Sequence, residues 1–297
     1  MSTVNKRILQ PQAHVINGVS AGGLVTHNIQ AGYDDTLQNP VDGLALAMAD
    51  LVTEFVRGSF SSQDWVHVIE LLTGTVGTSV FYQRKSGVAE ASGYIKHTLN
   101  KPVMHRMALS IRHRKYATAN GSFECMAADE TEGIADLWVT ADSQSAPTYV
   151  PAARGLEIEA CALGTLEIFH VIGLDIAIEL PLVKASQDGD IGYTAVDALT
   201  NGMRASGSLI IQDAAISGGK VKAVDMVTAN RGNLVLSVKQ SQGVANKALT
   251  VAGVKFTSTG HNAGGENYDE FSVPFIIAND AGTPLTLSGT NKILTIA

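Results

Sequence analysis

The stretch closest to a chemical motif is residues 217–220, Ser-Gly-Gly-Lys, which precede a run with helical spacing and resemble part of a phosphate-binding loop. Such a loop has another glycine five residues before Gly219, where this chain has Ala214. It also has a hydroxyl side chain after the lysine to bind magnesium, where this chain has Val221. We therefore interpret the stretch as the cap of a helix and not as a nucleotide site.

Carboxylates and imidazoles are present without the spacing that metal or nucleophilic chemistry requires. Residues 188–190 and 266–270 carry carboxylates, but neither stretch has the alternating oxygen ligands of an EF-hand loop. The eight histidines include no pair at metal spacing on a helix, and none adjoins a serine or cysteine in a nucleophile turn. The sequence therefore predicts no catalytic, metal or cofactor site and no enzyme, although distant residues can still meet in the fold.

Three further features could suggest a functional site: a basic stretch, the two cysteines and one histidine. Residues 112–115, Arg-His-Arg-Lys, form the most basic stretch, which suits a solvated face or a subunit contact, and alternatively a site for DNA phosphates. The formal net charge of −7 gives no support to a nucleic-acid-binding surface. Cys125 and Cys161 lack metal-type spacing, so we expect two buried thiols in a reducing compartment. His170 lies among apolar residues of one parity and is expected in the core or at an interface, not as a ligand.

Length and composition indicate a globular protein. The 297 residues suit one large domain or two of about 150. Apolar residues make up 45% of the chain and charged residues 16%, which is enough for real cores and argues against disorder. Residues 1–7 lack the apolar segment of a secretion signal, and no apolar run approaches the ~18 residues of a membrane span. We therefore expect the chain to be made and folded in a cytoplasm.

One pattern occurs twice. Residues 65–86 and 220–241 align without a gap at an offset of 155 residues, with five identical pairs. In each copy apolar residues at helical spacing come first, then a glycine (Gly77 or Gly232), then a β-prone run. Asp64 is placed to cap the first helix. We predict an internal duplication, and two unrelated helix–strand units that look alike are the alternative.

Alternation of apolar and polar residues predicts strands in both halves. The run at 166–180, which follows alternation at 156–160, is too long for one strand, so a bend or a sheet switch at Gly173 is expected. Apolar parity switches at Gly253, as a β-bulge causes, and Pro274 places its strand at an edge or a bulge. The other expected strands cover residues 24–29, 103–114, 207–211, 249–256 and 268–277, and a final hairpin of 285–287 with 293–296.

Two features set the first half apart from the second. Apolar residues at helical spacing predict a helix at 44–56, and residues 87–100 form a long connection. Two prolines and small polar residues mark a linker between the halves. The expected fold is mainly β, with two similar β-sandwich or β-barrel-like domains that each pack one α-helix. The predicted parts are an N-terminal arm at 1–13, a first domain at 14–145, a linker at 146–154 and a second domain at 155–297.

Four features together resemble the tail tube proteins of tailed bacteriophages. They are the repeated unit at 65–86 and 220–241, the alternating strands near 103–114 and 156–180, the connection 87–100, and the Gly-His-Asn-Ala-Gly-Gly loop at 260–265. The resemblance covers most of the chain but contains no short diagnostic motif. It implies a structural virion protein that self-assembles into stacked rings and forms a tail tube for DNA passage.

The resemblance also implies partners and a location. A duplicated member would make, from three subunits, the pseudo-sixfold ring that single-domain members make from six. Other tail proteins, such as the tape measure and the tail terminator, would bind the tube, which would lie in the virion tail after assembly in the host cytoplasm. DNA would be lumen cargo only, and no membrane is involved. Edge strands suit pairing between subunits, and an acidic protein suits a lumen that repels phosphate.

Other functions remain open at this point. Within the same class, the chain is alternatively a baseplate hub or distal tail ring protein. From another class, it is a virion decoration protein or glycan-binding module whose loops 87–100 and 260–267 make the contact. An enzyme with a site between the two halves is the third alternative. For a tube protein, we expect the arm 1–13 or the connection 87–100 to contact a neighbouring subunit.

Overall fold

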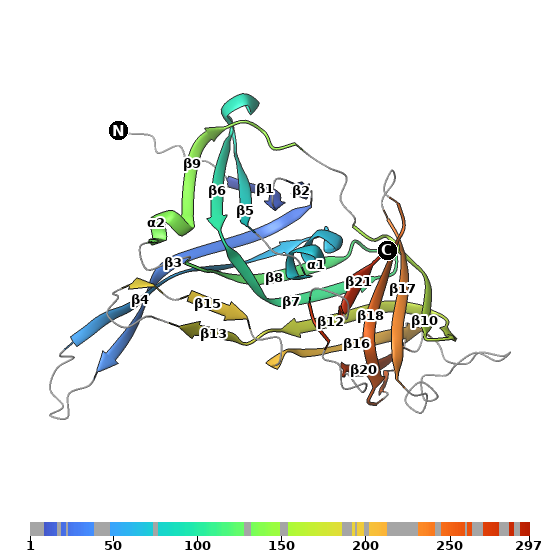
Figure 1. The fold of residues 1–297 in the computed structure, drawn as a ribbon. Coiled ribbons are helices and arrows are strands. Elements are labelled where there is room, and N and C mark those ends of the chain that lie inside the picture. Colours follow the sequence, from blue (N-terminus) through green and yellow to red (C-terminus); the bar gives the residue numbers. More distant parts are fainter. Residues whose placement is uncertain are drawn as a thin grey trace.

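The computed structural model describes residues 9–16, 19–21, 23–38, 48–73, 77–127, 132–148, 154–185, 192–193, 195–198, 202–212, 231–240, 245–258, 260–262, 270–278, 285–287 and 292–297. Within these ranges the chain is mainly β, as the sequence predicts. The helices there are α1 (Trp65–Thr73), α2 (Ile134–Leu137) and a 3-10 turn, η1 (Glu90–Ser92). Figure 1 shows a small sheet at the top and a larger, curved sheet across and to the right.

The small sheet is antiparallel and contains only strands from the first half of the sequence. In spatial order its strands are β2 (Val19–Ala21), β1 (Leu9–Ile16), β5 (Thr78–Lys85), β6 (Tyr94–Asn100) and β9 (Trp138–Gln144). Its strand β1 lies against β3 of the large sheet, so the two sheets are in contact.

The large sheet runs through both halves of the sequence, because β12 pairs with β7. In order, its path is β11 (Leu166–Ile168), β10 (Glu157–Leu163), β17 (Gly232–Lys239), β18 (Lys247–Phe256), β20 (Glu270–Ile277), β16 (Arg204–Gln212), β12 (Val171–Glu179), β7 (Pro102–Arg112), β8 (Thr118–Cys125), β4 (Met48–Ser62) and β14 (Gly192–Tyr193). Beside this path, β3 (Leu24–Gln38) pairs with β4, β19 (Gly260–Asn262) with β20, and β21 (Leu294–Ile296) with β18. A separate ribbon joins β13 (Leu182–Ala185) and β15 (Ala195–Ala198).

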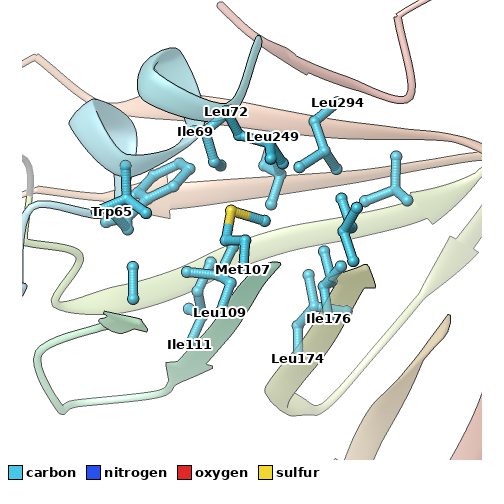
Figure 2. Close-up of a cluster of buried hydrophobic side chains, with 14 of the residues drawn as sticks. Trp65, Ile69, Leu72, Met107, Leu109, Ile111, Leu174, Ile176, Leu249 and Leu294 are labelled. Carbon is cyan, nitrogen blue, oxygen red and sulfur yellow. The ribbon is translucent and has the colours of Figure 1, made fainter. Parts of the chain in front are cut away.

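Helix α1 packs inside the curve of the large sheet. The backbone N–H of His67 donates to Asp64 Oδ1 at 3.3 Å, so Asp64 caps the helix as predicted. Figure 2 shows apolar side chains of the helix facing residues from both halves of the sequence. The labelled members of this core are Trp65, Ile69 and Leu72 on α1, Met107, Leu109 and Ile111 on β7, Leu174 and Ile176 on β12, Leu249 on β18 and Leu294 on β21.

The helix predicted at 44–56 is wrong, because residues 48–62 form strand β4. The strand pairs with β3 along its length and with β8 from Arg57 to Ser62, and this pairing overrides the helical spacing of its apolar residues. Gly58 lies within this strand. A Cβ there would overlap the carbonyl oxygen of Asn28 and the ring of Phe123, so glycine lets three strands approach closely.

Two other segments are more regular than the sequence suggested. The long connection at 87–100 is a turn and η1 followed by β6, which pairs with β5 on one side and β9 on the other. Only residues 86–93 remain as a connection. The expected arm at 1–13 overlaps β1, which begins at Leu9 and pairs with β5, and residues 1–8 lie outside the described residues.

The predicted irregularities in the second half are confirmed in part. The 166–180 run is broken at His170, which has a φ of 55°, and Gly173 instead follows a bulge within β12. The bulge at Gly253 is confirmed, with a φ of 65° and an extra residue in β18. Pro274 lies inside the sheet and not at an edge. Its backbone nitrogen, which carries no hydrogen, faces the break between the β18 and β19 ladders. Proline therefore costs the sheet no hydrogen bond there.

Several predictions fall outside or beside the described residues. The second predicted helix, near 220–227, lies outside them, and so do residues 149–153 of the linker. The final hairpin does not form as expected. Thr286 makes a parallel bridge with Lys292, and β21 pairs with β18.

Candidate functional site

The pairing of β7 with β12 forms a seam between the two halves of the sequence. We call it the internal seam, and it joins Arg106–Arg112 of β7 to Gly173–Glu179 of β12 in antiparallel register. Arg112 donates through Nη1 and Nη2 to the two carboxylate oxygens of Asp175, at 2.8 and 2.7 Å. Main-chain pairing and ion pairs therefore hold the halves together.

The basic stretch at 112–115 is divided by this geometry. Arg112 is neutralised by Asp175, whereas Arg114 and Lys115 are exposed in the turn that follows β7. His113 accepts a hydrogen bond from the N–H of Ile158 at its Nδ1, 3.3 Å away. The first residue of the stretch therefore belongs to the internal seam, and two cations remain at the surface.

Strand β3 presents a long edge. Its fifteen residues pair with β4 on one side, and β4 is its only strand partner among the described residues. The short strand β19 likewise pairs only with β20 in that part of the chain. An unpaired edge offers N–H and C=O groups to another strand, and monomeric proteins usually protect such edges with lysine, proline or a covering element. Strand β3 contains no lysine, arginine or proline.

Beneath this edge, aromatic and imidazole rings form a row across the small sheet. His14 pairs with Phe81, Phe81 with His97, and His97 with Thr140 in direct register. The imidazole of His14 stacks on Phe81 at 4.1 Å between ring centroids, and His27 from β3 stacks on Phe81 at 5.0 Å. The row therefore fills the space between the small sheet and β3.

A series of side-chain hydrogen bonds runs through this row to β3. Trp138 Nε1 donates to His97 Nδ1 at 3.3 Å, and His97 Nε2 lies 3.3 Å from Gln83 Oε1. Gln83 Nε2 lies 3.0 Å from His27 Nε2. We call these four residues, Trp138, His97, Gln83 and His27, the histidine network.

The imidazoles in this region favour the neutral form. Burial, with a smaller effect of His97, lowers the pKa of His27 from 6.5 to about 4, and burial also lowers the pKa of His97. Burial lowers the pKa of His67 to about 4 and that of His14 well below its usual value. His14 Nδ1, His27 Nδ1 and His67 Nε2 are buried and have no hydrogen-bond partner within the described structure. Added protons would therefore meet few acceptors.

A cavity of about 480 Å³ lies beside the turn between β11 and β12. Glu159, Glu167 and Gln212 supply polar groups to its wall, and His170 and the exposed Phe169 lie at the turn. Its features suit binding of a polar ligand. His170 is exposed there, so the core alternative of its prediction is wrong, and the interface alternative stays a prediction.

The residues that the sequence offered for thiol, phosphate or metal chemistry have different outcomes in the structure. Cys125 and Cys161 are free and buried, as expected, and burial raises the pKa of each thiol to about 12, which makes neither a nucleophile at neutral pH. The stretches 217–220 and 188–190, and 266–269, lie outside the described residues. Among the residues that are described, no group of three or more His, Cys, Asp or Glu side chains is arranged to hold a metal ion.

Sequence reasoning missed the histidine network and the seam. The four network residues come from four strands, so no spacing along the chain reveals them. The alternation of β7 and of β12 was visible, but which strands pair across the halves was not.

Comparison with protein-family models finds no matching family, and comparison with curated proteins finds no match. No helix in the described part of the chain has the length and apolar character needed to cross a membrane.

Proposed function

We propose that this chain is a structural virion protein whose copies assemble into stacked rings that form a phage tail tube for DNA passage. The observation that carries the proposal concerns two equivalent pairs of strand edges. One pair is joined inside the chain, and the other pair is open among the described residues. Inside the chain, β7 pairs with β12. Their counterparts in the opposite halves of the sequence, β19 for β7 and β3 for β12, have open edges within the described structure.

The equivalence of these strands rests on a repeat of register between the halves. The ladder of β1 with β5 skips Gln12, and the ladder of β10 with β17 skips Glu159. The ladder of β3 with β4 skips Val25, and that of β12 with β16 skips Ile172. Both pairs of bulges are related by the same offset of 147 residues. Bulges are specific features that re-aim a strand, so their repetition supports two copies of one β domain.

Close approaches and backbone conformations also recur. At Gly58 and at Gly207 a Cβ would overlap a carbonyl oxygen of the next strand and a phenylalanine ring. At the entry to β7 and in the equivalent part of β18, Lys101 and Gly253 have φ values of 48° and 65°. The predicted duplication therefore gains support from geometry that the original 22-residue match did not include.

The internal seam supplies a template for contact between copies. Its central pairs are Ser110 with Asp175, Leu109 with Ile176 and Ala108 with Ala177. The β19–β20 ladder matches the β7–β8 ladder, which makes β19 the counterpart of residues 108–110. Transferred to the open edges, the seam predicts that Asn28, Ile29 and Gln30 of one copy pair with Asn262, His261 and Gly260 of the next.

Such a contact joins two different edges, so it is head-to-tail. Head-to-tail contacts close into rings when the rotation between copies closes. Because each copy would hold two domains already joined by the same type of seam, three copies would supply the six domains of a pseudo-sixfold ring. The absence of lysine and proline from β3 supports this use of its edge.

The far end of the β3–β4 hairpin supports contacts between rings. Beyond Thr53, where β4 meets Gly192 of β14, the two strands pair only with each other in the part of the chain that is described. Figure 1 shows the hairpin extending away from the two sheets at the lower left. An isolated two-stranded ribbon has little stability in water, which favours a role in contact with another copy.

The wider assignment follows from this assembly. The tube would lie in the virion tail after assembly in the host cytoplasm, bind a tape measure and a terminator, and take DNA as lumen cargo. The net charge of −7 supports passage of DNA without binding. Because β6 lies between β5 and β9, we confine the expected contact of 87–100 with a neighbour to its first part, residues 87–93.

Negative-stain electron microscopy of the purified chain tests the proposal. Rings that stack into tubes are the expected result. Discrete rings that never stack would favour the baseplate hub or distal tail alternative. A dispersed monomer at high concentration, measured by sedimentation velocity, would overturn self-assembly.

The cavity beside His170 favours a second candidate, a decoration or glycan-binding module. Its two glutamates, a glutamine and an exposed phenylalanine suit a polar ligand with an apolar face. This candidate predicts glycan-array binding that is lost in a Glu167→Ala variant and a protein that does not polymerise. Tubes that form with no glycan signal would exclude it.

A further inference from the structure

The histidine network connects the open edge of β3 to the small sheet. His27 lies on β3, in the part of the strand that the seam template pairs with another copy, and Gln83 lies on β5. The 3.0 Å contact between Gln83 Nε2 and His27 Nε2 joins the two sheets. The position of the assembly edge therefore depends on a polar contact in which one member, His27, can be protonated.

The direction of every hydrogen bond in the network is fixed from one end. The indole N–H of Trp138 only donates, so His97 Nδ1 accepts and carries no proton. The proton of neutral His97 is then on Nε2 and is donated to Gln83 Oε1. The amide N–H of Gln83 consequently donates to His27 Nε2, which also carries no proton.

Protonation of either His27 or His97 disrupts this pattern of donors and acceptors. On His27 it sits at Nε2 and faces the Gln83 amide, which is also a donor, while Nδ1 is buried without a partner within the described structure. On His97 it sits at Nδ1, where it must turn to Thr140 Oγ1, 3.3 Å away, and leaves the Trp138 N–H without its acceptor. Each protonated form therefore loses a hydrogen bond that the separated sheets would replace with water.

Other ionisable groups surround the network. The described ones on the elements packed around it are His14 on β1, Glu54 and Arg57 on β4, Asp64 before α1, His67 and Glu70 on α1, Tyr82, Arg84 and Lys85 on β5, Tyr94 and Lys96 on β6, Glu124 on β8, Asp136 on α2 and Asp142 on β9. Lys85 pairs with Asp142. Alternation places Arg84 and Lys96 on the opposite face of the small sheet from Gln83 and His97. His14 and His67 titrate in the same direction as the network, because burial also disfavours their charged forms.

The second half lacks the network at the equivalent positions. The residues that replace His27, Gln83, His97 and Trp138 there are Leu174, Val238, Leu249 and Leu294, all buried. Where the equivalent edge is paired inside the chain, these positions are apolar and cannot titrate. Where the edge is open, they form the histidine network.

We propose that the histidine network is an acid-sensitive catch that holds β3 in position for pairing with another copy only while His27 and His97 are neutral. Acidification separates β3 from the small sheet and dissolves contacts between copies. The effect on assembly rests on the proposed function, whereas the separation of β3 from the small sheet does not.

The sign of the effect follows from the lowered pKa values. The pKa of His27 is about 4 in the folded protein and 6.5 when exposed, so the opened form binds more protons. The closed form is fully favoured above about pH 6.5. The equilibrium shifts toward opening by up to about tenfold per pH unit for each titrating histidine as the pH falls toward 4.

Hydrogen exchange measured by mass spectrometry tests the catch, with rates corrected for the intrinsic effect of pH. Protection of residues 24–32 should fall at least tenfold between pH 7 and pH 4.5, while protection of the equivalent residues 171–179 changes little. The triple variant His27→Leu, Gln83→Val and His97→Leu, which copies the second half, should lose this response. A His113→Gln variant, altered outside the network, should keep it.

A second variant protects the test against a folding defect in the first. Gln83→Glu keeps the shape of the side chain and places a carboxylate between the two histidines, so protonation of both becomes favourable and opening should move to lower pH. An acid response that is absent from the wild type, or equal in wild type and both network variants, would overturn the catch. Light scattering at the same pH values reports assembly separately. A protein that never forms rings at any pH would contradict the proposed function, and exchange at residues 24–32 would still decide the catch.

Discussion

At the scale of residues, burial decides which titratable groups matter. Eight histidines are visible in the sequence, but their spacing gives no sign that His14, His27, His67 and His97 lie together. They come from β1, β3, α1 and β6, and only the contact between the two sheets brings them close. His170, which the sequence predicted in the core or at an interface, is exposed at a turn. Its apolar parity was genuine, but the strand breaks at that residue.

The buried His67 predicts a loss of stability in acid. Its pKa is about 4 in the folded protein against 6.5 when exposed, so the unfolded state binds the proton more strongly. The contribution of neutral His67 to the free energy of unfolding is fully present above about pH 6.5. It falls by about 3 kcal/mol as the pH approaches 4. Urea unfolding of the wild type and of His67→Leu at pH 7.5, 5.5 and 4.5 measures this.

The variant should have a flatter pH dependence of its unfolding free energy. His170→Gln is the matched control, because that histidine is exposed and its replacement should leave the wild-type slope unchanged. An identical slope in wild type and His67→Leu would contradict the assignment.

At the scale of elements, the sequence was informative where local pattern and tertiary pairing agree. The alternation of β7 and of β16, the helix that begins after Asp64, and the bulge at Gly253 were predicted and are present. Strand β4 was missed because its apolar residues also fit a helical face. Its pairing with β3 and β8 is a non-local property that no window of sequence contains. Strand β6, which occupies part of the predicted connection at 87–100, was missed for the same reason, since its pairing with β5 and β9 is also non-local.

Helix α1 predicts a sharp contrast between two adjacent residues. Ile69 is 2% exposed and faces the core shared by β7, β12 and β18, whereas Glu70 is exposed. Ile69→Ala should lower the free energy of unfolding by about 2–5 kcal/mol through lost burial and the cavity it leaves. Glu70→Ala should change it by less than about 0.5 kcal/mol.

Chemical denaturation followed by circular dichroism measures both variants. Because the core joins the two halves, a single cooperative transition is expected in each case. Equal effects of the two substitutions would show that the helix does not pack as described.

At the scale of the whole molecule, one large sheet spans both halves of the sequence. The internal seam links the predicted duplication to the proposed assembly, because a strand of the first half is paired there with a strand of the second half. The sequence predicted repeated units and edge strands, but the seam depends on the register of β7 against β12, which the sequence does not contain. In the proposed assembly, the open edges of β3 and β19 are the places where another copy would make the same pairing.

Cysteine cross-linking tests this central claim most directly. Asn28 and Asn262 are the open-edge counterparts of Asp175 and Ser110, which pair directly in the internal seam. Directly opposed residues of antiparallel strands lie about 4.5–5.5 Å apart between Cα atoms, within the range of a disulfide. The native thiols, Cys125 and Cys161, are buried and do not compete.

The double variant Asn28→Cys, Asn262→Cys should give, under mild oxidation, a ladder of covalent oligomers on a denaturing gel. Each single variant should give at most a dimer, and Ser110→Cys with Asp175→Cys should cross-link within one chain as the positive control. A double variant that stays monomeric while the seam control is oxidised would contradict the account.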